Sequence, residues 1–222
     1  MGLLFSNTFQ SFHSCIFCDL FLLPARVEHN PTRFEGTVAA VCERQRREGE
    51  LDCARYYLKD SLVPQFERWF KLNNPIVDIP PVLKIFPSST SFAENRITDE
   101  SFVREAPYKS DGQVEIDAPI KLHEFIKSNE NKLRIAPVTV FGAPKYSSSV
   151  VLYGEGTHAL ASDPKAELVL WTITGGKAAI DVDHKVFNLG PNDMARVEKG
   201  KSVSLTVSDG VVLALRMPGK QQ

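Results

Sequence analysis

The stretch DLFLLPARVEHNPTR, Asp19–Arg33, decides how the rest of this chain is interpreted. Its four apolar residues, Leu20–Leu23, run directly into Pro24, a pattern typical of a buried strand that ends at a turn. The turn then presents His29 between two arginines. A neutral imidazole binds borderline metal ions, and a planar guanidinium pairs with a carboxylate. The stretch is therefore either a loop that binds a metal ion and a carboxylate, or a surface loop whose histidine has no functional role.

The composition describes an ordinary globular protein with no strong electrostatic field. The 222 residues are 43% hydrophobic and 24% charged, and the net charge is −1. Such a balance gives no overall attraction to nucleic acid or to an anionic membrane. We therefore expect neither nucleic acid nor a membrane as a partner.

The four cysteines, Cys15, Cys18, Cys42 and Cys53, are too few and too unevenly spaced for a disulfide framework. They predict reduced thiols in a cytosolic protein. The Cys15-x-x-Cys18 pair has no second ligand pair for zinc and no βαβ context for redox chemistry. We assign it no function.

The sequence pattern changes after residue 18. Residues 1–18 carry no charged side chain and show no clear strand or helix period, so we expect an atypical leader. Residues 19–58 predict strands, with further candidates at Phe34–Cys42 and Leu51–Leu58. So few strands make only part of a barrel and leave an unpaired edge.

Residues 59–110 predict a linker of helices and loops. Val63–Leu72 places Phe66, Trp69 and Phe70 at the i, i+3, i+4 spacing of an amphipathic helix. The prolines that follow should interrupt any helix, and Thr98–Glu100 should cap a second, short one.

Residues 111–222 predict a complete barrel or jelly roll after a short helix at Ile120–Ser128. The strands are expected at Val138–Phe141, Ser149–Gly154, Glu167–Thr174, Ala178–Val182, Val186–Leu189, Met194–Glu198, Ser202–Val207 and Val211–Arg216. The turns between them are expected at Gly142–Pro144, Gly175–Gly176, Asp183–His184, Gly190–Asp193, Lys199–Gly200 and Ser208–Gly210.

Two segments resemble known proteins. Pro24-x-Arg26-x-x-His29 resembles the second metal-binding motif of the cupins, and Leu20–Phe70 is similar to one cupin family, 3-hydroxyanthranilate 3,4-dioxygenase. The resemblance continues through Glu167–Gly175 (ELVLWTITG) and covers about residues 19–222. It implies an all-β, two-barrel cupin: an incomplete N-terminal catalytic barrel at 19–58, the linker at 59–110, and a complete, non-metal barrel at 111–222.

The resemblance also implies a reaction and a site. The family opens the ring of 3-hydroxyanthranilate with O₂ at Fe(II), on the tryptophan–kynurenine route to quinolinate and NAD, and its animal members are monomers. His29 matches the third iron ligand, Arg33 an arginine that binds the substrate carboxylate, and Glu43 a glutamate that contacts the substrate's amino and hydroxyl groups. A carboxylate so placed can also take the phenol proton, which would make Glu43 catalytic.

One departure leaves two hypotheses open. The first cupin motif, a histidine followed six residues later by a glutamate, should supply the other two iron ligands, and a further substrate arginine should precede it. Residues 1–18 contain His13 but no glutamate or arginine, so we expect an alternative start or a truncated form. The chain is then either a dioxygenase or an inactive fragment or pseudoenzyme that acts as a binding module.

The C-terminal barrel does not replace the missing ligands. Val203 stands where its histidine motif would place a ligand, and His158 and His184 are expected in turns as surface histidines. An unrelated cupin, such as a sugar isomerase, does not account for the Leu20–Phe70 string.

Overall fold

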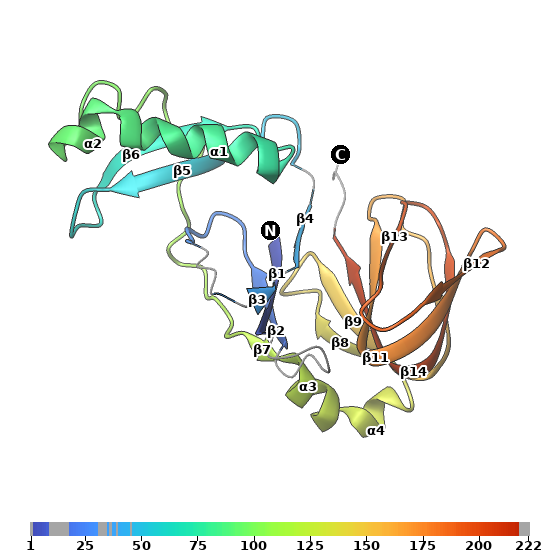
Figure 1. Ribbon diagram of the computed structural model, residues 1–222. Coiled ribbons are helices and arrows are strands. Elements are labelled where there is room, and N and C mark those ends of the chain that lie inside the picture. Colours follow the sequence, from blue (N-terminus) through green and yellow to red (C-terminus); the bar gives the residue numbers. More distant parts are fainter. Residues whose placement is uncertain are drawn as a thin grey trace. The chain divides into compact units, whose positions relative to one another are not determined.

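The computed structural model describes residues 2–8, 18–30, 35, 37–38, 40–44 and 46–217, and strands dominate this part of the chain (Figure 1). The predicted all-β class is confirmed. Contacts divide the chain into two compact units, the first being Met1–Arg44 with Gly112–Gln222 and the second Gln45–Asp111. The predicted domain boundaries after residues 18, 58 and 110 stay a prediction.

The smaller sheet of unit 1 has the strand order β3-β1-β2-β7, with β4 also paired to β1. Its five strands are β1 (Gly2–Thr8), β2 (Cys18–Leu23), β3 (Thr37–Val38), β4 (Val41–Glu43) and β7 (Ile120–Lys121).

Two expectations about this sheet have different outcomes. The strand predicted from Leu20–Leu23 is confirmed as β2. Residues 1–18, in which we found no clear strand period, nevertheless include β1, which pairs antiparallel with β2 from Gly2↔Leu23 to Asn7↔Cys18. Ladder hydrogen bonds to a neighbouring strand can form without a regular side-chain period, which is why the sequence pattern missed it.

The larger sheet of unit 1 curls into the C-terminal barrel (Figure 1), and its strand order is β12-β11-β14-β9-β8, with β10 paired to β14 and β13 to β11. Its seven strands are β8 (Val138–Phe141), β9 (Ser149–Tyr153), β10 (Gly156–Leu160), β11 (Leu168–Val182), β12 (Lys185–Leu189), β13 (Met194–Val197) and β14 (Val203–Arg216). Two helices, α3 (Leu122–Ser128) and α4 (Glu130–Leu133), precede it. The helix predicted at Ile120–Ser128 is confirmed from Leu122 onward.

The turns predicted at Gly175–Gly176 and Ser208–Gly210 are wrong, because both segments lie inside the long strands β11 and β14. The ladder between these strands shifts register between Ile173 and Lys177, as at a β-bulge. A Cβ on Gly176 would lie 2.8 Å from the Asp209 carbonyl oxygen. The glycine therefore permits a close approach of two strands, and it does not mark a chain reversal. The turn at Asp183–His184 is confirmed, and both residues have positive φ.

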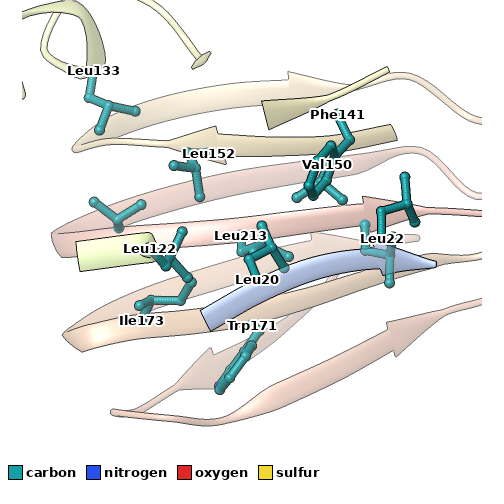
Figure 2. Packing of buried hydrophobic residues seen from close by; sticks show 12 residues of the cluster. Leu20, Leu22, Leu122, Leu133, Phe141, Val150, Leu152, Trp171, Ile173 and Leu213 are labelled. Carbon is teal, nitrogen blue, oxygen red and sulfur yellow. The ribbon is translucent and has the colours of Figure 1, made fainter. Parts of the chain in front are cut away.

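Both faces of β11 are buried because alternate side chains enter two hydrophobic clusters. Leu168 and Leu170 enter the barrel interior with Leu205, whereas Trp171 and Ile173 enter an outer cluster. The outer cluster, shown in Figure 2, also contains residues of β2, α3 and β9. Its buried members are Leu20, Leu22, Leu122, Leu133, Phe141, Val150, Leu152, Trp171, Ile173, Val211, Leu213 and Leu215.

Unit 2 is built on an antiparallel pair of strands, β5 (Asp52–Tyr57) and β6 (Pro64–Phe70). The strand predicted at Leu51–Leu58 is confirmed, but the helix predicted at Val63–Leu72 is wrong. Gln65 and Glu67 alternate with Phe66, and all three are buried, at 2%, 8% and 0% exposure respectively. Because polar residues are buried on one face of β6, its sequence lacks the alternation of apolar and polar residues that would have identified a strand.

Two helices and a 3₁₀ turn follow β6: α1 (Pro75–Ile85), η1 (Phe86–Ser88) and α2 (Thr90–Glu94). The expectation that the prolines interrupt the helix is wrong, because α1 runs through Pro80 and Pro81. Both prolines are exposed, so water can solvate the carbonyl groups that their missing N–H groups leave unpaired. The helix predicted after Thr98–Glu100 is also wrong, since the Ser101 hydroxyl accepts the Thr98 N–H at 2.9 Å and closes a turn.

Candidate functional site

The histidine loop begins where β2 ends. Leu20 and Leu22 point into the outer cluster at 0% and 3% exposure, and they fix the face of the strand. Pro24 cannot donate a ladder hydrogen bond, so the strand ends before it. Arg26 then adopts a left-handed conformation with φ 63°, and the chain leaves the sheet. The buried leucines and the proline together project the following polar residues out of the sheet.

His29 is exposed in this loop, and its ring is oriented locally. Nδ1 lies 3.1 Å from the carbonyl oxygen of Val27. Since a carbonyl can only accept a hydrogen bond, this contact favours the tautomer that carries its proton on Nδ1. Nε2 then keeps its lone pair, which is the form of imidazole that binds a metal ion.

Glu43 is the last residue of β4, and its side chain is exposed. The sheet register places it near the start of the histidine loop, because Gly2 pairs with Glu43 on one side and with Leu23 on the other. Two strand spacings of roughly 4.8 Å separate the two backbones by about 10 Å. Glu43 and the loop that carries His29 therefore belong to the same end of one sheet.

Arg33, His13 and Cys15 lie outside the described residues, so the structure places neither the predicted substrate arginine nor the first half of the Cys15-x-x-Cys18 pair. Cys42, on β4, packs against the outer cluster, and burial raises the pKa of its thiol. A raised pKa keeps the thiol protonated and unreactive at neutral pH.

The residues that the structure describes do not form a three-ligand metal site. No group of three His, Cys, Asp or Glu side chains among them converges as ligands would. A facial iron triad needs two histidines and a carboxylate on one side of the metal. Within this part of the chain, His29 is exposed and lacks the further donors that Fe(II) would need.

The two C-terminal histidines have different surroundings. The expectation that His158 lies in a turn is wrong: it lies in β10, where its Nε2 is 2.8 Å from the Gly154 carbonyl oxygen and its ring meets Tyr153 edge-on at 5.0 Å. His184 lies in the β11–β12 turn, as expected. Val203 is 2% exposed in the barrel interior, so the position matching a ligand is part of the apolar core.

Unit 2 contains a polar cluster of Arg55, Glu67 and Trp69 that the sequence did not predict. Arg55 Nε lies 2.6 Å from Glu67 Oε1, and Trp69 Nε1 donates to Glu67 Oε2 at 3.1 Å. The Arg55 and Glu67 side chains are only 17% and 9% exposed. Their register across β5 and β6 could have signalled the pair, had the second segment been assigned as a strand.

Among the described residues, no helix is long and apolar enough to cross a membrane.

Known proteins are similar to this chain along most of its length. A family model described as 3-hydroxyanthranilic acid dioxygenase matches residues 15–87. Proteins named 3-hydroxyanthranilate 3,4-dioxygenase from Caenorhabditis briggsae and Caenorhabditis elegans are each 34% identical, over 90% of this chain and 71% and 70% of their own lengths. The protein of that name from Homo sapiens is 30% identical over 87% of this chain and 67% of its own.

Solved structures match only part of the chain. The EutQ protein of Clostridium difficile covers 38% of it at 14% identity and a TM-score of 0.30. A Cupin_2 domain of an XRE family transcriptional regulator from Enterobacter cloacae covers 38% at 11% identity and a TM-score of 0.33. At these scores the likeness carries no further argument.

Proposed function

This chain belongs to the 3-hydroxyanthranilate 3,4-dioxygenase family, and from this we propose that it acts in the O₂-dependent ring opening of 3-hydroxyanthranilate. The observation that carries the proposal is the 34% identity that extends over 71% of the Caenorhabditis briggsae protein. The resemblance found in the sequence is thereby confirmed at the level of the family, a family of dioxygenases.

Arg33 and Glu43 are proposed to hold the substrate. A guanidinium fork binds a benzoate-type carboxylate through two parallel hydrogen bonds, which suits Arg33, four residues after His29. Glu43 would contact the amino and hydroxyl groups and accept the phenol proton. The register that places Glu43 and the histidine loop at one end of a sheet supports this assignment.

His29 is proposed as one ligand to Fe(II), the metal that the family resemblance implies. Its protonated Nδ1 leaves Nε2 as the donor, which supports the role. The described residues supply neither the second histidine nor the carboxylate of a triad. Metal binding therefore requires donors other than these.

That shortage supports a second candidate function: a non-catalytic member of the family that binds the substrate without turning it over. In this case Arg33 and Glu43 would act as a recognition module, and His29 would hold no metal. The specific observation in its favour is the exposed His29 with no converging ligands among the described residues.

An anaerobic Fe(II) titration followed by a turnover assay separates the two candidates. For a dioxygenase we expect one iron per chain and, on admitting O₂ with 3-hydroxyanthranilate, formation of the ring-opened product. His29→Ala should abolish both, whereas His184→Ala, a turn histidine of the C-terminal barrel, should change neither. Substrate binding with neither iron nor product would favour the recognition module. Absence of binding, iron and product together would contradict both candidates.

The wider setting is proposed on the same basis. The ring-opened product would lead to quinolinate and then to NAD, and the protein would act as a monomer in the cytosol. Sedimentation of the purified chain as a single species of about twice its calculated 24.8 kDa mass would contradict the monomer.

A further inference from the structure

A pocket lies in the C-terminal barrel, and none of its lining residues is among the site residues that the family resemblance implies. Its volume is about 150 Å³. Three of its lining residues, Ser149, Val151 and Tyr153, alternate along β9 and therefore point to the same face of the sheet. Leu168 and Ala214 line it from β11 and β14 and belong to the cluster of the barrel interior. The pocket is thus an opening into the barrel.

Small side chains make this space. Ala214 pairs directly with Val151 across β14 and β9, and Ala159 and Ala161 of the β10 segment complete the same wall. Larger residues at these positions would fill the opening as Leu205 and Ile180 fill the rest of the interior. An apolar cavity of about 150 Å³ is known to accommodate a benzene ring.

Arg216 places a positive charge at the rim of this pocket. It pairs with Ser149 on β9 and with Leu168 on β11, so it lies between two lining residues. One of its N–H groups donates to the Ala161 carbonyl oxygen. In the described part of the chain no carboxylate lies within ion-pair distance of Arg216, unlike Arg196, which forms a fork with Glu167. Most of its five N–H donors are therefore available to a ligand.

Tyr153 supplies a further donor. Its ring is half-buried and packs edge-on against His158, which limits its motion. Burial raises the pKa of its phenol, with Arg216 acting in the opposite direction, so the hydroxyl keeps its proton at neutral pH. The guanidinium, the phenol and the Ser149 hydroxyl can all donate hydrogen bonds, and the remaining wall is apolar.

We propose that this pocket is a second ligand site that binds a small aromatic carboxylate, with the ring against Val151, Leu168 and Ala214 and the carboxylate on Arg216. A carboxylate matches the guanidinium fork, and a single ring matches the volume. The proposal does not depend on the proposed function, since none of its residues belongs to the first site.

Benzoate is the probe that tests it, and 3-hydroxyanthranilate is avoided so that failure here says nothing about the first site. Benzoate is titrated into the full chain carrying ¹³C-labelled methyl groups, and methyl shifts are followed by NMR. We expect saturable shifts of the Val151, Leu168 and Ala214 methyl groups. Arg216→Met and Ala214→Leu should each weaken binding at least tenfold.

Two controls keep the test decisive. Arg196→Met removes another β-strand arginine of the same barrel and should leave benzoate binding within twofold. Benzyl alcohol, which has the same ring without the charge, should bind at least tenfold more weakly than benzoate. The proposal is overturned if benzoate produces no saturable shift of these methyl groups, if Arg216→Met binds it as well as the unaltered chain, or if benzyl alcohol binds equally well.

Discussion

The five-stranded sheet and the C-terminal barrel differ in how their strands are buried. In the barrel, β11 is buried on both faces, with Leu170 in the interior cluster and Trp171 in the outer one. In the smaller sheet, β2 alternates between fully buried Leu20 and half-buried Phe21. The partners of Leu20 are residues of the barrel, such as Leu213 (Figure 2).

The barrel therefore supplies the packing, and the smaller sheet carries the proposed site residues. The barrel strands contribute most of the buried apolar side chains of unit 1, whereas His29 and Glu43 are exposed at one end of the smaller sheet. The strand that carries the histidine loop is held by the outer face of a barrel that contributes none of the proposed dioxygenase residues. A loop held in this way can present polar residues without a complete core of its own.

The largest expected effect is on stability, when the contact between the two regions is removed. Leu20→Ala deletes a fully buried side chain from the outer cluster and should lower the free energy of unfolding by about 2–5 kcal/mol. Urea denaturation followed by Trp fluorescence measures it. Val186→Ala, at a position that is 65% exposed on β12, should change stability by less than about 0.5 kcal/mol. Equal effects of the two substitutions would show that β2 does not depend on the barrel.

A smaller loss is expected where the barrel strands approach each other. Gly176→Ala places a Cβ 2.8 Å from the Asp209 carbonyl oxygen and 3.0 Å from that of Ile173, so the backbone must shift, at a cost of about 1–3 kcal/mol. Gly112→Ala meets no atom within 4 Å and should be nearly neutral. If Gly176→Ala proves as stable as the unaltered protein in thermal unfolding, the close approach at the bulge is not a constraint.

The smallest effect is expected at the barrel surface, from the fork between Glu167 and Arg196. The hydrogen bond from Arg196 lowers the pKa of Glu167, against the raising effect of burial. A lowered carboxyl pKa stabilises the fold above the ordinary pKa of glutamate, and this contribution disappears as the pH falls through the lowered value. Since Arg196 is 69% exposed, solvent screening keeps the effect small.

Glu167→Gln should therefore be slightly less stable than the unaltered chain at pH 7 and equally stable near pH 2, as measured by urea denaturation. Addition of 1 M NaCl at pH 7 should reduce the difference. A difference that grows as the pH falls would contradict the assigned sign.

The sequence correctly predicted secondary structure where a local pattern determines it. It failed where contacts with residues distant in the chain determine whether a segment is a strand or a helix. Leu20–Leu23 before Pro24 correctly predicted a strand and its end. Phe66, Trp69 and Phe70 match a helical spacing equally well, and the buried polar partners that make this segment a strand, Arg55 and the Ser91 carbonyl, are distant in the chain. Contacts of that kind leave no local signal.

The same limit applies to the sites. The family resemblance predicted roles for His29 and Glu43, but it could not indicate that Glu43 and the loop that carries His29 lie at one end of a sheet, which follows from the pairing of Gly2 with two strands. No sequence motif marks Arg216, because its proposed role depends on Ser149 and Leu168, its neighbours on the adjacent strands. Its alternation with Ala214 and Val212 indicated only which face of the sheet it occupies.

The most direct test of the functional assignment is calorimetric titration of 3-hydroxyanthranilate into the metal-free chain without O₂. We expect binding at one site per chain, weakened at least about tenfold by Arg33→Met, since a hydrogen bond to a charged group contributes roughly 1.5–3 kcal/mol. Arg196→Met, an exchange of an arginine outside both proposed sites, should bind within twofold of the unaltered chain. Absence of saturable binding, or equal binding by the Arg33→Met chain, would contradict the proposal that this chain recognises the substrate of its family.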